Sequence, residues 1–160
     1  MDNLLTLGSL FDGSGGFPLG AVFSGILPLW ASEVAPFAIR VTTKRLPWMR
    51  HLGDIHGING ANIEPVDIIT FGSPCTDMSV AGKRAGLEGK QSVLFYEAIR
   101  IIREMRSATH GKYPRFIVWE NVPGAFSSNK GEDFRAVLTA IVQTAEPEAE
   151  VPAPDKKGWP

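Results

Sequence analysis

Short apolar runs alternate along the chain with longer segments whose apolar residues recur at helical spacing. Strand-like runs cover residues 4–11, 27–34, 51–53, 66–71 and 115–122. Helical stretches are expected over residues 18–24, 36–46, 92–105 and 132–144. Uninterrupted β-branched runs are typical of buried strands, and apolar residues three and four apart are typical of helices. This alternation predicts an α/β fold built on a doubly wound, mainly parallel sheet.

Several polar side chains lie at or just beyond the ends of the predicted strands. In chain order they are Asp12, Glu33, Asp54, Cys75 and Glu120. Parallel sheets bind ligands outside the carboxyl ends of their strands. The five residues are therefore expected at one edge of the sheet, where together they indicate a functional site.

Composition excludes several classes of protein. The chain has 160 residues, with 16 basic and 17 acidic side chains and a net charge of −1, so no excess of positive charge drives binding to nucleic acid. A single cysteine excludes a disulfide framework, and with three scattered histidines no metal site is expected. The N-terminus lacks the basic segment of a secretory signal, and glycines and prolines break the uncharged stretch 13–32, so a cytoplasmic location is expected.

A glycine-rich turn, FDGSGGF, follows the first predicted strand at residues 11–17. Its spacing is not GxGxxG, because position 18 is proline, and it is not a phosphate-binding P-loop. A ligand-binding turn and a plain tight turn both stay open. Glu33, about twenty residues after the turn, is placed either to bind ribose hydroxyls or to lie in solvent.

Cys75 is the most informative single residue, because it follows Gly-Ser-Pro at a strand end instead of lying in an apolar run. No histidine is near it in sequence, which weakens a protease-like arrangement. Glu120 is expected to be partly buried, with a raised pKa that suits a proton donor. The loop between the fourth strand and the next helix carries cations suited to phosphate or to solvent, whereas Arg100, Arg103 and Arg106 are expected on a solvated helix face.

Taken together, these segments resemble the amino-terminal half of the DNA (cytosine-5) methyltransferases. The ordered motifs are FDGSGG, Glu33, GDI at 53–55, GSPC at 72–75, LFYEAIRI at 94–101 and ENV at 120–122. The sequence around GSPC is most similar to that of bacterial and phage members, including those of restriction-modification systems. The resemblance implies a sheet of the S-adenosylmethionine-dependent methyltransferase type, incomplete at its C-terminal side.

The resemblance also implies roles for individual residues. Cys75 would be the nucleophile and Glu120 the acid. S-adenosyl-L-methionine would be bound by Phe11, Asp12, Gly13, Gly15, Gly16, Glu33, Val34, Asp54, Ile55, Gly72, Pro74 and Leu94. Double-stranded DNA, with one cytosine flipped out, would contact Ser79, Lys83, Arg84, Lys90 and Gln91.

The sequence departs from the family pattern at its end. Residues 1–145 are expected to form the N-terminal part of the catalytic domain, and the proline-rich residues 146–160 a connection. The Gln-Arg-Arg motif, the target-recognition domain and the final Asn-containing motif are absent from the sequence. Two hypotheses follow: a methyltransferase fragment that is inactive alone and needs a complementing C-terminal portion, or a residual module that binds the cofactor or a partner. Missing strands would also favour self-association.

Overall fold

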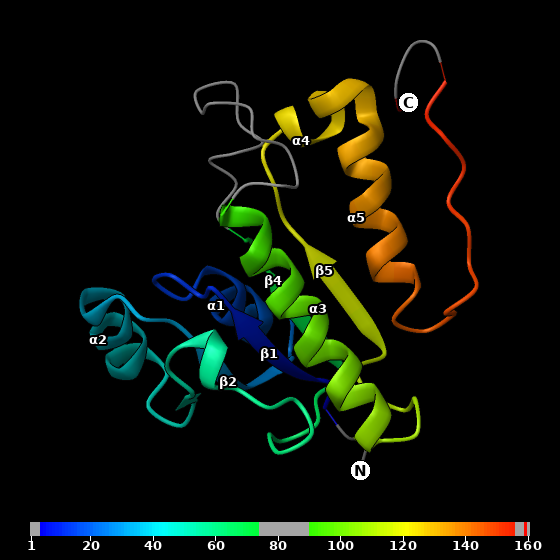
Figure 1. Cartoon of the computed structure of the whole chain (residues 1–160). Helices are drawn as coiled ribbons and strands as arrows, with labels where there is room; N and C mark the ends of the chain where they lie inside the picture. Colours follow the sequence, from blue (N-terminus) through cyan, green and yellow to red (C-terminus); the bar gives the residue numbers. More distant parts are fainter. Residues whose placement is uncertain (1–3, 74–89, 156–158, 160) are drawn as a thin grey trace. The chain divides into compact units, whose positions relative to one another are not determined.

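The computed structural model describes residues 4–73, 90–155 and 159. Five strands form one sheet in the order β3-β2-β1-β4-β5 (Figure 1). All four pairings are parallel, which confirms the expected α/β architecture. The strands are β1 (Thr6–Leu10), β2 (Leu27–Ser32), β3 (Arg50–His51), β4 (Ile68–Phe71) and β5 (Phe116–Trp119).

The expected helices are present, with ends shifted by a few residues. They are α1 (Gly16–Phe23), α2 (Pro36–Arg45), α3 (Lys90–Ala108) and α5 (Glu132–Val142). Three short elements were not expected from the sequence, because they are too brief to show a hydrophobic period. They are η1 (Ile55–Gly57), α4 (Gly124–Ser127) and η3 (Ser128–Gly131). Pro36 begins α2, where its lack of an N–H group leaves no hydrogen bond unmade.

The chain divides into two compact units. The first contains the described residues up to Gly72 together with Arg100–Glu120, and it therefore holds the whole sheet. The second contains the remaining described residues, including the first ten residues of α3 and all of α5.

Within the first unit, the chain winds outward from β1 in both directions. The connections through α1 and α2 lead to β2 and β3, and the connection through α3 leads from β4 to β5 on the other side. Right-handed crossovers in opposite directions place helices on opposite faces of a sheet. Figure 1 accordingly shows α3 in front of the sheet and α1 behind it.

The core of the sheet depends on a missing side chain in β1. Gly8 pairs with Trp30 of β2, and a Cβ atom at Gly8 would lie 2.2 Å from the Trp30 ring. Trp30 is only 1% exposed, and its Nε1 donates a hydrogen bond of 2.9 Å to the carbonyl oxygen of Glu64. Any larger residue at position 8 would displace this indole from the core.

Strand β5 is less buried than its apolar sequence predicts. Phe116 is 52% exposed and Val118 is 43% exposed. Among the described residues β5 pairs with β4 alone, so it is the last strand of the sheet and one of its faces has fewer neighbours. The expectation that residues 115–122 form a buried strand is therefore wrong.

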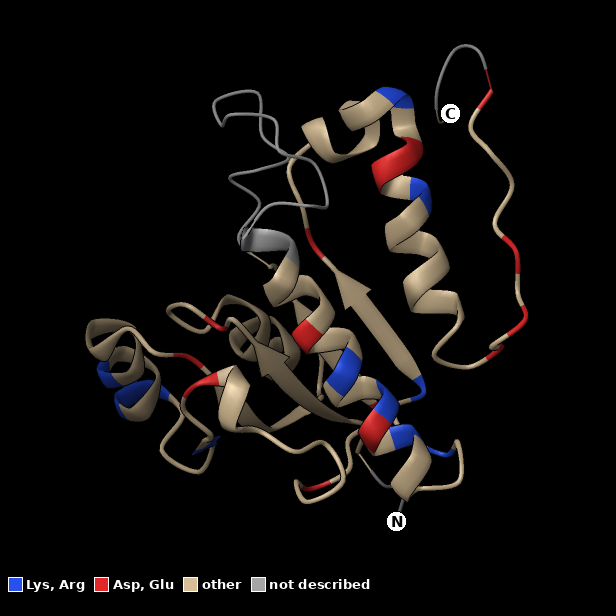
Figure 2. Cartoon of the chain, viewed as in Figure 1, with Lys and Arg blue, Asp and Glu red and all other residues tan. Residues whose placement is uncertain are grey.

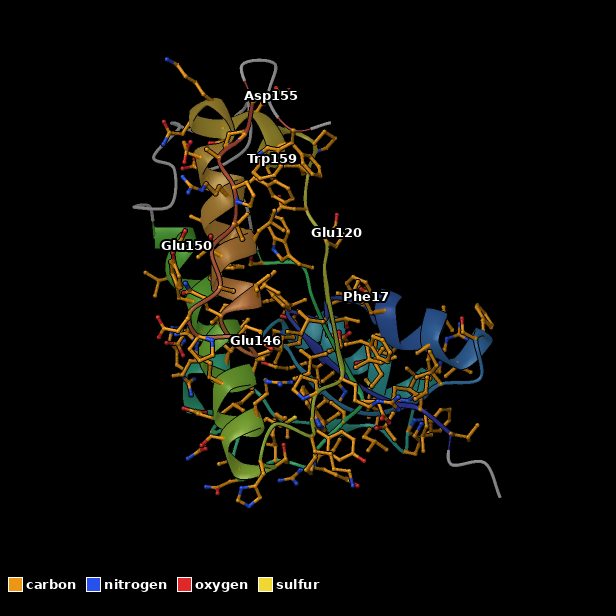
Figure 3. All side chains as sticks on the ribbon, turned by 90° about the vertical axis from the view of Figure 1, so that its right-hand side faces the viewer. Phe17, Glu120, Glu146, Glu150, Asp155 and Trp159 are labelled. Atoms are coloured by element: carbon orange, nitrogen blue, oxygen red, sulfur yellow. The ribbon has the colours of Figure 1, made fainter. Side chains whose placement is uncertain are left out.

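In the second unit, the proline-rich tail is fastened to α5. Arg135 Nε donates to the carbonyl oxygen of Val151 at 2.8 Å, and Gln143 Nε2 donates to that of Ala149 at 3.2 Å. Trp159 Nε1 donates to the carbonyl oxygen of Gly131 at 2.9 Å. Figure 3 shows this course along the helix, and Figure 2 shows that acidic residues follow one another on the tail.

Candidate functional site

The candidate site is built on the carboxyl ends of the strands in the first unit. The chain leaves β1 toward β2 on one side, whereas β4 lies on the other side of β1. Ligands of open α/β sheets bind at such a reversal of strand order. The glycine turn after β1 and Gly72 after β4 flank this point. Glu33 and Glu120 follow β2 and β5 directly, Asp12 comes two residues after the end of β1, and Asp54 comes three residues after the end of β3.

The glycine turn leaves β1 through an unusual backbone conformation. Phe11 has a φ of 55°, in the left-handed region that aromatic residues rarely adopt. The Asp12 N–H donates to the carbonyl oxygen of Ser32 at 3.0 Å, which fixes the turn to the end of β2. Gly15 also has a positive φ of 87°, and a Cβ atom there would lie 2.7 Å from Thr42 Cγ2. The turn is thus held in a form that requires glycine at position 15.

Asp12 carries a buried carboxylate. Its residue is 6% exposed, and among the described residues neither carboxylate oxygen has a hydrogen-bond partner. Burial raises the pKa of Asp12 from 3.8 to about 6. The nearby Ser9 hydroxyl lowers it in part, although no hydrogen bond joins the two, and the charge of Glu33 raises it further. A buried carboxylate in this state favours a cationic ligand.

Glu33 is in the opposite situation, because its carboxylate accepts three backbone hydrogen bonds. Oε2 accepts from the Gly13 N–H at 2.7 Å, and Oε1 accepts from Val34 at 2.7 Å and Ala35 at 2.8 Å. Partial burial raises the pKa of Glu33, but the bonds from Ala35, Val34 and Gly13 together outweigh it, and the net pKa is lowered. Glu33 therefore joins the glycine turn to the start of α2 and is not simply solvated.

Asp54 is the N-cap residue that precedes η1, and it is exposed. Its Oδ1 accepts from the backbone N–H of His56 at 2.9 Å and contacts the Nδ1 of the same residue at 2.8 Å. These hydrogen bonds, the backbone one foremost, lower the pKa of Asp54. Ile55 is buried. The third strand was expected to end on Asp54, but β3 ends at His51.

Glu120 extends the ladder between β4 and β5. Its N–H donates to the carbonyl oxygen of Phe71 at 3.0 Å. A Cβ atom at Gly72 would lie 2.8 Å from Glu120 Oε2, so the carboxylate lies over the glycine that precedes the Ser73-Pro74-Cys75 segment. Glu120 is exposed, which corrects the expectation of partial burial. The strand end, and not an apolar pocket among the described residues, sets its position.

The structure brings together only part of the predicted site. Phe11, Asp12 and Gly13 are consecutive in the turn, the Gly13 N–H joins this turn to Glu33, and Gly72 adjoins Glu120. Pro74, Cys75, Ser79, Lys83 and Arg84 lie outside the described residues, as does most of the expected loop. Lys90 and Gln91 begin α3 instead of ending that loop. Val34 is exposed, and Leu94 lies half-buried on the part of α3 in the second unit.

Two residues that the sequence analysis did not assign to the site contact its η1 segment. Arg100, expected in solvent, donates from Nη1 to the carbonyl oxygen of Ile58 at 2.8 Å and from Nη2 to that of Ile55 at 3.2 Å. Glu104 Oε2 accepts from the Gly60 N–H at 2.6 Å. Arg106 is not solvated either, since it donates to the carbonyl oxygen of Pro114 at 2.9 Å. The four-residue spacing of Arg100 and Glu104 on one helix was the available signal.

The described part of the chain holds neither a metal-ligand cluster nor a membrane-spanning helix. In residues 4–73, 90–155 and 159, no group of three or more histidine, cysteine, aspartate or glutamate side chains is arranged to hold a metal ion. Over the same residues, none of the helices combines the length and the apolar character needed to cross a membrane.

Known proteins are similar to this chain in sequence, and a solved structure is similar to it in fold. A protein of Escherichia phage P1 named DNA N-6-adenine-methyltransferase is 37% identical over 111 residues, which cover 65% of this chain and 15% of that protein. The type II methyltransferase M.NgoFVII of Neisseria gonorrhoeae is 33% identical over 133 residues, or 82% of this chain and 34% of that enzyme. A crystal structure of a prophage-encoded E. coli protein, described as a DNA modification methyltransferase, aligns with a TM-score of 0.66 at 24% identity.

The alignments cover most of this chain but only a minor part of each relative. The structural alignment takes in 86% of this chain but 38% of the E. coli protein, so the chain spans well under two thirds of each of these relatives. The family model for C-5 cytosine-specific DNA methylases matches residues 5–144, which include every strand and the glycine turn. The chain therefore belongs to the C-5 cytosine-specific DNA methylase family.

Proposed function

We propose that this chain is the cofactor-binding part of a DNA (cytosine-5) methyltransferase, with S-adenosyl-L-methionine as methyl donor and a flipped cytosine of double-stranded DNA as acceptor. One observation supports this above the others. At the reversal of strand order, a buried carboxylate without a partner among the described residues adjoins a glycine turn held by Glu33. Membership of the methylase family makes a cationic sulfonium cofactor the natural ligand of that turn.

The residues of the first unit fit such a cofactor. Asp12 would accept hydrogen bonds from its ammonium group, and Glu33 has lone pairs left for its ribose hydroxyls. Asp54 and the Ile55 N–H would bind the adenine edge, with Phe11 packed against the ring. Bound there, S-adenosylmethionine supplies an electrophilic methyl group. The other proposed cofactor residues are Gly13, Gly15, Gly16, Val34, Gly72, Pro74 and Leu94.

The proposed chemistry makes cytosine C5 reactive. The thiolate of Cys75 adds to C6 while Glu120 protonates N3, and C5 then takes the methyl group. Loss of the C5 proton to a base restores the double bond and expels the thiolate. The base must leave the duplex to be reached. Exposure of Glu120 is consistent with access from outside. Ser79, Lys83, Arg84, Lys90 and Gln91 are proposed to contact DNA phosphates.

Turnover by these residues alone is not expected. The two relatives named above, from phage P1 and from Neisseria gonorrhoeae, are much longer chains, of which this chain matches 15% and 34%. We therefore expect the 160-residue chain to bind the cofactor but to need a complementing C-terminal portion for methyl transfer. The alternative is a cofactor-binding or partner-docking module without catalysis, and it predicts that such complementation never restores transfer of labelled methyl groups to DNA.

The deciding experiment is calorimetric titration of the chain with S-adenosylhomocysteine. We expect saturable one-to-one binding that is lost in Glu33→Ala and kept in Glu146→Ala, a control that removes an exposed carboxylate from the tail. No binding by folded wild-type chain would refute the proposed cofactor site. For the chemistry, a 5-fluorocytosine duplex should trap a covalent adduct in the complemented enzyme, and Cys75→Ser should abolish it.

Self-association through β5 is also proposed. Phe116 and Val118 leave apolar surface on the last strand of the described sheet, and such edges pair readily with other strands. Sedimentation equilibrium should show concentration-dependent dimers that Val118→Lys weakens. A monomer at every concentration tested would contradict this proposal.

A further inference from the structure

Helix α3 holds the segment that carries Asp54 and Ile55 at several points. Arg100 donates to the carbonyl oxygens of Ile55 and Ile58, which lie at the start of η1 and just after its end. Glu104 accepts from the N–H of Gly60. Three backbone groups of one short segment are thus bound by two side chains of one helix, all within the first unit.

The two side chains also bind each other. Arg100 Nη1 lies 2.9 Å from both carboxylate oxygens of Glu104, one helical turn away. The side chains are 33% and 30% exposed, so they are partly shielded from solvent. Each therefore orients the other toward the η1 segment.

Close packing fixes the distance between the segment and the helix. A Cβ atom at Gly60 would lie 2.1 Å from the carbonyl oxygen of Ile101, so only glycine allows this approach. Ile55 and Ile58 are both buried. The segment has little freedom to move away from α3 while these contacts last.

One peptide group connects Arg100 to Asp54. The carbonyl oxygen of Ile55 accepts from Arg100, and the N–H of the same planar peptide unit, on His56, donates to Asp54 Oδ1. A positive charge on the carbonyl side strengthens the N–H as a donor. Arg100 therefore acts on the Asp54 carboxylate without touching it.

We infer that Arg100, held by Glu104, is a positioning residue that sets the selectivity of this site for the adenine base of its cofactor. The inference rests on the proposed function, in which Asp54 accepts a hydrogen bond from the adenine amino group. It assigns to α3 a role in reading the base, in addition to the residues that contact the ligand.

The test exchanges the two charges. Arg100→Glu combined with Glu104→Arg keeps an ion pair on the helix but places a carboxylate where Arg100 faces the carbonyls of Ile55 and Ile58, and a cation where Glu104 faces the Gly60 N–H. Arg103→Ala is the matched control, because Arg103 lies about one helical turn after Arg100 on the same helix and is exposed. Dissociation constants are measured by calorimetry for S-adenosylhomocysteine and for S-inosylhomocysteine, in which oxygen replaces the amino group.

We expect wild type and Arg103→Ala to prefer the adenine ligand to the same extent. In the exchange variant the preference should fall by about tenfold, mainly through weaker binding of the adenine ligand. A purely structural role would weaken both ligands equally, so an unchanged preference in folded protein overturns the inference while the cofactor site stands. If wild type binds neither ligand, the proposed function fails and this inference fails with it.

A milder variant covers the case in which the exchange variant does not fold. Arg100→Gln keeps a long helix-forming side chain but has a shorter reach and no charge. It should reduce the preference by about fivefold, since a charged donor to two carbonyls is lost. Hydrogen exchange at Gly60 should accelerate in the same variant. A wild-type preference in Arg100→Gln would overturn the inference.

Discussion

The ends of β1 and β2 show how differently one fold treats two carboxylates on neighbouring strands. Asp12 is buried, and its oxygens have no partner among the described residues, whereas Glu33 is half-buried and accepts three backbone hydrogen bonds. The pKa of Asp12 is raised to about 6, and that of Glu33 is lowered. Glu33 therefore stabilises the folded chain as well as the site, while Asp12 reduces stability and is expected to favour ligand binding.

The largest effect is expected from removing the Glu33 carboxylate. Glu33→Ala leaves the N–H groups of Gly13, Val34 and Ala35 without their acceptor. We expect a loss of about 2–4 kcal/mol in the free energy of unfolding, measured with urea, because each such bond contributes about 1 kcal/mol. Binding of S-adenosylhomocysteine should fall at least about a hundredfold. Stability equal to wild type would contradict the structural role of Glu33.

Removing the charge at Asp12 should have the opposite effect on stability. Asp12→Asn at pH 7 is expected to raise the free energy of unfolding by about 1–3 kcal/mol, because a buried charge with a pKa shifted by about two units is replaced by a neutral amide. Affinity for S-adenosylhomocysteine should fall by about tenfold, because the ammonium group loses a charged acceptor. A variant that is both less stable and unchanged in affinity would contradict this contrast.

The contrast also predicts a pH dependence. Between pH 3.8 and about 6, Asp12 is still protonated in the folded chain but ionised in the unfolded chain, so the folded state binds more protons. The contribution of Asp12 to stability therefore falls as pH rises through this window and is constant above it. Urea unfolding of wild type minus Asp12→Asn, followed from pH 4 to pH 7, should show this decline. A difference that rises with pH would reverse the assignment.

The smallest effect on stability is expected at the third carboxylate. Asp54 is exposed and contacts only His56 in the bonds described above. Asp54→Asn should leave the urea midpoint unchanged while weakening binding of S-adenosylhomocysteine by about tenfold. A large shift of the midpoint would show that Asp54 resembles Glu33 more than its exposure indicates.

The sequence was sufficient to predict the sheet and, within a few residues, where most of its strands end, although β3 ends at His51 and not at Asp54. Apolar runs such as residues 66–71 and helical spacing in residues 132–144 reflect burial, which is decided locally along the chain. Strand ends followed from these runs, and so did the common edge for Asp12, Glu33 and Glu120. The exposure of Phe116 could not be predicted, because it depends on the strand being last in the sheet.

The hydrogen-bond partners of individual side chains could not be predicted from the sequence, for a physical reason. The bond from Arg100 to Ile58 joins residues 42 positions apart, and the acceptor is a backbone carbonyl that every residue possesses. Composition and periodicity therefore cannot predict which backbone carbonyl a given side chain will bind. For the same reason the sequence could place Glu33 at the turn but could not predict that backbone N–H groups would take up its carboxylate.

The fastening of the tail to α5 has a consequence for how this region can evolve. Arg135, Gln143 and Trp159 all donate to backbone carbonyls, so two of these contacts hold the tail by its main chain and not by the identity of its side chains. Substitutions at Ala149 or Val151 can therefore accumulate without changing the path of the tail. Among homologues, we expect the donors Arg135 and Gln143 to vary more slowly than the tail residues that they bind.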